Sequence, residues 1–116
     1  MEQQHVFRVD RFHVPNAARE EFLQRVSATH KILAHQRGFV RDLLLEQPAG
    51  PDGFNLVTMA EWESQEAVER AREAIAELHR QLGFDPRDLI RRLGIRAEMG
   101  GYRPLQVQGG GLANTL

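Results

Sequence analysis

Cysteine is absent from the 116 residues of this chain. Without it the protein has no disulfide, no thiolate metal site, no iron–sulfur cluster and no cysteine nucleophile, and the absence suits the cytoplasm. The length fits one domain with a single hydrophobic core. We therefore expect a cytoplasmic domain that is stabilised by packing rather than by covalent cross-links.

An excess of one charge and a long apolar run are also missing. The chain has 15 Lys and Arg against 16 Asp and Glu, a formal net charge of -1. Nothing in this balance favours nucleic acid or an anionic membrane as a partner. No apolar run approaches the roughly 20 residues that span a bilayer. Residues 1–5 have no cationic region followed by an apolar stretch, so we expect no secretory signal.

Four segments have the apolar and β-branched composition of strands. The first ends at Pro15, because proline cannot donate to a sheet ladder. The second and third flank a turn rich in proline and glycine, so they are expected to pair as an antiparallel hairpin. The predicted strands are 5–14, 39–46, 54–63 and 95–105.

Two long segments and one short segment have the composition and boundary residues of helices. Polar residues that cap helices precede each of them, and a glycine follows each. The short helix starts with the pair Asp-Pro, in which proline takes the first helical position. The predicted caps and ends are Asn16 and Gly38, Ser64 and Gly83, and Asp85 and Gly94.

The order of these elements predicts an α+β fold. It is βαββαβ with an extra short helix before the last strand, which matches the ferredoxin-like arrangement with an antiparallel sheet. We expect residues 1–105 to form this domain. Residues 106–116, with three consecutive glycines, are expected to be a flexible tail.

The predicted strands are apolar on both faces. Leu43 and Leu45 fall on one face, and Val40 and Leu44 fall on the other. An antiparallel sheet with one wet face shows clean alternation instead. Because two long helices cover only one face, we expect the other to pack against the same face of a second copy, as a homodimer. The alternative is that these residues lie at sheet ends or under the tail.

Three side chains are candidates for chemistry. His30 falls on the apolar face of the first helix with Phe22, where a neutral imidazole accepts a phenolic proton as a general base. The alternative is a histidine satisfied by a backbone carbonyl or water. Trp62, the sole tryptophan, is either an aromatic wall or a core anchor. His79, at the edge of the second helix's apolar face, lines the same cavity or is a boundary residue.

Charged and metal-binding patterns are less informative. Arg8, Arg41 and Asp42 lie inside predicted strands, so they pair at the rim of a dimer or point into a polar cavity. An arginine in the cavity holds a carboxylate or another anion. The five histidines show no HxxxH or HxH spacing on one element, so we expect no metal site.

The segment 58–67, Thr-Met-Ala-Glu-Trp-Glu-Ser-Gln-Glu-Ala, is similar to a signature in which a strand ends in Glu-Trp-x-Ser and enters a helix. The pairs Val14-Pro15 and Glu21-Phe22 and the turn 36–40 fit the same pattern. Over about residues 5–105, the chain resembles the antibiotic biosynthesis monooxygenase family. The resemblance implies a dimeric α+β barrel, in which two ferredoxin-like protomers pack sheet to sheet.

The resemblance also implies an activity. Some members oxidise phenolic or quinol compounds without metal, flavin or haem, and use a strand asparagine four residues before the tryptophan to hold the substrate. Thr58 occupies that position here. Haem-degrading members use an asparagine on the first strand and a tryptophan and a histidine on the second helix. Asp10 and Ala71 stand near the first two positions and His79 is two residues out of register, which disfavours haem degradation.

The leading hypothesis is a monooxygenase that needs no cofactor or metal and acts on a small phenolic or quinol-type aromatic compound. The candidate catalytic residues are His30, Trp62 and His79, and the candidate substrate-binding residues are Thr58, Phe22 and Arg41. A second hypothesis is a non-catalytic ligand-binding or stress-related dimer, which the threonine at 58 motivates. A third is an isomerase that uses the same histidine without O₂.

Overall fold

Four strands form an antiparallel sheet in the computed structural model, which describes residues 4–48 and 52–105. The strand order is β2-β3-β1-β4. Together with a helix after β1 and another after β3, this order confirms the predicted ferredoxin-like α+β fold. The strands are β1 (Val6–His13), β2 (Phe39–Glu46), β3 (Leu56–Trp62) and β4 (Arg96–Tyr102).

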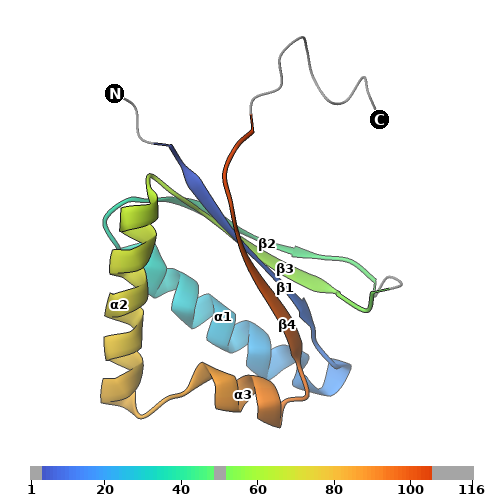
Figure 1. The fold of residues 1–116 in the computed structure, drawn as a ribbon. Coiled ribbons are helices and arrows are strands. Elements are labelled where there is room, and N and C mark those ends of the chain that lie inside the picture. Colours follow the sequence, from blue (N-terminus) through green and yellow to red (C-terminus); the bar gives the residue numbers. More distant parts are fainter. Residues whose placement is uncertain (1–3, 49–51, 106–116) are drawn as a thin grey trace, which may run out of the picture.

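The helices all lie on one side of this sheet (Figure 1). A short 3₁₀ turn precedes the first of them. Within the described part of the chain, no helix has both the length and the apolar character needed to cross a membrane. The predicted tail 106–116 lies outside the described residues. The elements are η1 (Asn16–Ala18), α1 (Arg19–Leu33), α2 (Gln65–Leu82) and α3 (Pro86–Arg92).

The predicted ends of the second and third helices are confirmed. Ser64 Oγ accepts a hydrogen bond from the Ala67 N–H at 3.1 Å. Gly83 ends α2 in the left-handed conformation. The Asp-Pro start of α3 also caps as predicted, because Asp85 Oδ1 accepts a hydrogen bond from the Arg87 N–H at 2.9 Å.

The predicted ends of the first helix, Asn16 and Gly38, are wrong. The chain first makes the turn η1, in which the Ala18 N–H donates to the Pro15 carbonyl at 2.9 Å, and no side chain caps α1. At the other end, α1 stops well before Gly38. That glycine has φ +90 because it lies in the turn into β2, where a Cβ would lie 2.5 Å from the Ala67 Cβ. It permits a close approach to α2 rather than ending a helix.

A β-bulge near the start of β2 decides which of its side chains face the helices. Phe39 pairs with Trp62 and Arg41 pairs with Glu61, so two steps along β2 match one step along β3. Successive side chains of a strand point to opposite faces, and one extra residue reverses that assignment. Asp42 therefore faces the helices, and Arg41 faces the opposite side of the sheet.

The buried apolar side chains form two clusters. One surrounds Trp62 beneath the first turns of α2, and the other surrounds Phe22 beneath α1 and α3. The cavity described below is lined by members of both clusters and so lies between them. The first cluster is Val6, Ala60, Trp62, Ala67, Val68 and Ala71, and the second is Phe12, Val14, Ala18, Phe22, Leu56 and Ile95.

The side of the sheet away from the helices, here called the outer face, is also apolar. Its central row runs from Leu43 through Met59 to Val9. Leu43 is 43% exposed, and Leu45 and Tyr102 on the same face are exposed to a similar extent. The prediction of a sheet with two apolar faces is therefore confirmed.

Candidate active site

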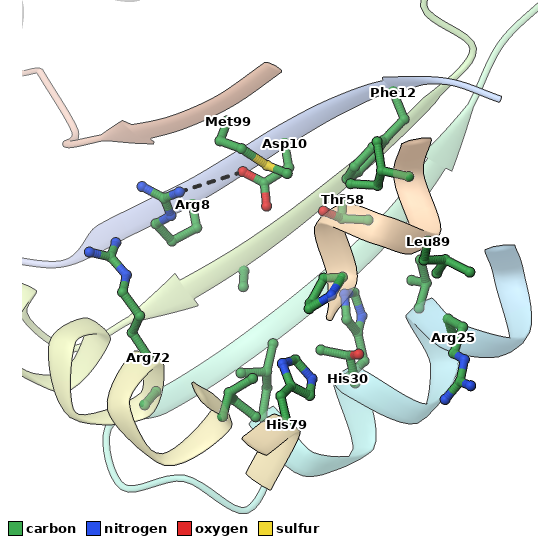
Figure 2. A pocket seen from close by; sticks show the side chains of 18 of the residues that line it. Arg8, Asp10, Phe12, Arg25, His30, Thr58, Arg72, His79, Leu89 and Met99 are labelled. Carbon is green, nitrogen blue, oxygen red and sulfur yellow. Dashed lines mark ion pairs between the residues drawn. The ribbon is translucent and has the colours of Figure 1, made fainter. Parts of the chain in front are cut away.

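A cavity of about 340 Å³ lies between the sheet and the three helices. Strands β1, β3 and β4 form its floor, and α1, α2 and α3 form its walls (Figure 2). Most of the side chains around it are apolar. This composition and size are typical of small-molecule sites, in which a few polar groups orient the ligand. The polar and charged side chains at the cavity are Arg8, Asp10, Arg25, Thr29, His30, Thr58, Arg72 and His79.

His30 projects from α1 into this cavity, and a carboxylate lies against its ring. Its Nδ1 lies 2.7 Å from Asp42 Oδ2, and the two side chains are 20% and 29% exposed. The bulge in β2 is what turns Asp42 toward α1. Because Nδ1 is engaged by Asp42, Nε2 is the ring nitrogen that remains for a ligand.

Asp10 lies on the cavity floor, where burial destabilises its charged carboxylate. Its Oδ1 is buried and accepts no hydrogen bond, and Arg8 Nη2 stays 3.7 Å away from that atom. Burial raises the pKa of the Asp10 carboxyl above the usual 3.8, although Arg8, a backbone hydrogen bond from Gly100 and the charge of His30 oppose the rise. The protonated form, which donates a hydrogen bond, is therefore favoured here more than in water.

Trp62 belongs to the cavity wall and to the core at once. It lines the cavity but is only 2% exposed. Its ring packs edge-on against Phe39, with centroids 5.5 Å apart. Thr58, also buried, lies on the same face of β3 as Trp62, with Ala60 between them, and it pairs across the strands with Asp10. The two readings of Trp62, aromatic wall and core anchor, therefore both describe its place.

The remaining predicted side chains lie on the helical walls. The ring of Phe22 packs at a tilt against that of Phe12, with centroids 4.9 Å apart. His79 approaches the ring of Phe84 edge-on at 5.1 Å, and the Arg25 guanidinium lies 4.4 Å from the centre of the same ring. All of these residues line the cavity. The structure thus brings five of the six predicted site residues to one place.

Arg41 is the predicted site residue that does not reach the cavity. It lies on the outer face, where its Nε donates a hydrogen bond to Glu61 Oε1 at 2.7 Å. His5 Nδ1 binds the other oxygen of Glu61, also at 2.7 Å. These two hydrogen bonds hold the pKa of the Glu61 carboxyl below its usual range. This pairing agrees with the alternative that strand charges pair with each other.

Sequence reasoning missed three charged residues that matter to the site. The sequence does not show which face of the sheet Asp42 lies on, because only the bulge in β2 decides that face. Arg25 and Arg72 belong to the polar sides of their helices but line the cavity. In Figure 2, Arg72 extends from α2 toward the side where Arg8 lies. Among the described residues, no group of three or more His, Asp or Glu side chains is arranged to hold a metal ion.

The sequence profile described as antibiotic biosynthesis monooxygenase matches residues 6–81, which contain β1 to β3 and nearly all of α2. The chain belongs to this family. The predicted resemblance is therefore confirmed, and the match includes every predicted site residue.

Solved structures of related proteins extend the comparison beyond residue 81. SnoaB from Streptomyces nogalater, a cofactor-independent oxygenase, is 30% identical over 92% of this chain and 99% of its own, with a TM-score of 0.66. Rv0793 from Mycobacterium tuberculosis is 18% identical over 90% of this chain and 99% of its own, with a TM-score of 0.60, which is a likeness of fold alone. No curated protein sequence gives a significant match.

Proposed function

We propose that this protein is a cofactor-independent monooxygenase that oxidises a small phenolic or quinol-type compound in the cavity. Family membership supports a monooxygenase, and the 30% identity with the oxygenase SnoaB supports one without a cofactor. The observation that carries the proposal is an imidazole with a carboxylate behind it, His30 with Asp42, at the edge of an apolar cavity.

Oxygenation without a cofactor requires the substrate to supply every electron. His30 takes the phenolic proton, and the resonance-stabilised anion that remains reduces O₂. One oxygen atom becomes bonded to the ring carbon opposite the phenol, and the other leaves as water with two hydrogens from the substrate. A phenol and O₂ thus give a quinone and water, with no external reductant. The apolar walls keep bulk water from the anion.

Asp10 has the role of a hydrogen-bond donor to the developing oxyanion in this proposal. Its protonated form is favoured by burial, which raises the carboxyl pKa.

Asp42 and Arg8 both neighbour Ala60 in the sheet, on opposite sides. The distance across the sheet from Asp42 to Arg8 is therefore about 10 Å, two strand spacings. A substrate of one or two aromatic rings spans that width from His30 toward β1.

The test is oxygen uptake by the purified protein with a panel of phenols, naphthols and hydroquinones, followed by ¹⁸O₂ labelling of the product. The His30→Ala variant is expected to lose about 10²- to 10⁴-fold in kcat/KM, the usual contribution of a general base. His35→Ala is the matched control, since His35 is exposed just beyond α1 and is not among the cavity residues. No uptake above buffer across the panel would contradict the proposal.

Thr58 favours a second candidate, a protein that binds the same class of ligand without turning it over. Its buried side chain occupies the position where quinone-forming members have the substrate-holding asparagine. This candidate predicts that a cavity ligand raises the melting temperature while oxygen uptake stays at the level of buffer. If turnover is equally fast without oxygen, a proton-transfer isomerase replaces both candidates.

We also propose that the protein is a homodimer in which two outer faces pack together. The exposed leucines on this face have no described helix to cover them. An isologous contact buries the same patch on both copies. The cavity lies on the opposite side of the sheet, so this dimer leaves it open to ligand.

A further inference from the structure

The bulge in β2 places a carboxylate directly behind the candidate base. If Val40 were an ordinary strand residue instead of the extra residue of a bulge, the alternation of β2 would turn Arg41 toward α1 and Asp42 away from it. With it, Asp42 lies opposite Ala60 on the helix side and reaches His30 Nδ1 at 2.7 Å. Bulges are common next to active sites, where they redirect a side chain.

We infer that Asp42 is a positioning residue, which fixes the Nδ1–H tautomer of His30 and so leaves Nε2 as the proton acceptor facing the cavity. The inference rests on the proposed function, because it assigns the base of that reaction. A base that is oriented by a third group is the usual arrangement in sites where a side chain must accept a proton. Neutral imidazole has one donor and one acceptor nitrogen, so a carboxylate at Nδ1 decides which is which.

The surroundings of His30 leave Asp42 as its one charged partner within ion-pair distance among the described residues. The other charged and titratable side chains around the cavity come from β1 (Arg8 and Asp10), α1 (Arg25) and α2 (Arg72 and His79), whereas α3 contributes only apolar side chains. Asp10 lies close enough to feel the charge of His30. None of these charged side chains of the cavity is therefore within ion-pair distance of His30, which leaves the Asp42 carboxylate behind it as the charged group that would set the tautomer.

A matched carboxylate exists on the same strand. Glu46 also faces α1 from β2, and its Oε2 lies 2.5 Å from Arg19 Nη2. It does not line the cavity. Comparing Asp42→Asn with Glu46→Gln therefore separates the orientation of His30 from the general loss of a link between β2 and α1.

The experiment combines two measurements on the full chain. Nitrogen-15 NMR of the histidine rings at mildly alkaline pH reports which nitrogen of His30 carries the proton. We expect Nδ1–H in the wild type and in Glu46→Gln, and a shift toward Nε2–H in Asp42→Asn, because an asparagine amide can donate to Nδ1. Steady-state oxygen uptake then gives kcat and KM. We expect Asp42→Asn to lower kcat about 100-fold or more with little change in KM.

Each outcome decides the inference. An Nε2–H or doubly protonated His30 in the wild type overturns it, and that measurement needs no variant. An unchanged kcat in an active Asp42→Asn enzyme also overturns it, as does an equal loss in Glu46→Gln. If the wild type consumes no oxygen with any substrate, the proposed function fails, but the tautomer of His30 still shows whether Asp42 positions it.

Discussion

Asp10 is the side chain whose replacement is expected to stabilise the protein at neutral pH. Burial raises the pKa of its carboxyl, so the native state keeps a proton that the unfolded chain releases. Stability therefore falls as the pH rises from the usual 3.8 through the raised value. Asp10→Asn removes this fall. We expect the Asp10→Asn variant to have a higher free energy of unfolding than the wild type at neutral pH. This difference should vanish when the pH is below 3.8, the usual pKa of the carboxyl.

Thermal unfolding at a series of pH values measures that gain. Glu73→Gln is the control, because Glu73 is an exposed carboxylate on α2 and its change should be small at every pH. A difference between Asp10→Asn and the wild type that stays constant across the pH series would show that ionisation of Asp10 is not the cause.

At this same scale, the sequence places some site residues and not others. The helical spacing of Phe22 and His30 predicts their common face, and the structure puts both at the cavity. Trp62 and Thr58 share a strand face by simple alternation. The face of the sheet on which Arg41 lies could not be predicted. A single extra residue in β2 shifts the alternation, so that the side chains after it point to the opposite face from the one that regular alternation gives.

At the scale of elements, the start of α2 offers a direct test of local stability. The Ser64→Ala variant loses the side-chain acceptor of the Ala67 N–H. This loss costs about 1 kcal/mol in the free energy of unfolding, the usual effect of removing an N-cap. Denaturant unfolding measures it. Ser27→Ala, an exposed change within α1, is the control. An equal effect of both changes would mean that Ser64 contributes only its helix propensity.

The helix α2 also shows why the existence of an element is easier to predict than its orientation. Its apolar spacing over Val68, Ala71, Ile75 and Leu82 predicts one buried face. Only the first two are buried, and Leu82 is 67% exposed. Figure 1 shows the reason, since α2 leads away from the sheet toward its C-terminal end. That angle depends on packing against other elements and has no local signal in the sequence.

At the scale of the whole molecule, the proposed dimer depends on the outer face. A lysine at position 43 would occur twice in an isologous contact, at the β2 end of the row that includes Met59 and Val9. We expect Leu43→Lys to convert the dimer to a folded monomer. Leu82→Lys, on α2 and more exposed, should leave the dimer intact. Sedimentation velocity measures both, and a monomeric wild type at micromolar concentration would contradict the proposal.

The overall topology follows from the sequence because it depends on the order of elements and on the apolar pattern of each. The two-sided apolar character of the strands is likewise a property of composition. The cavity is different in kind. Its volume of about 340 Å³ depends on how far α2 departs from the sheet and on which side chains fill the gap. Neither quantity is encoded in a local segment.

The division of the apolar side chains into two clusters has a consequence for what a ligand does. No residue belongs to both the Trp62 cluster and the Phe22 cluster, and β1, β3 and α1 run from one to the other beside the cavity. Regions with few shared contacts open independently of one another. A ligand in the cavity contacts both clusters and fills the space that they line. Its binding free energy then adds to the stability of the fold, and the two halves of the molecule become one cooperative unit.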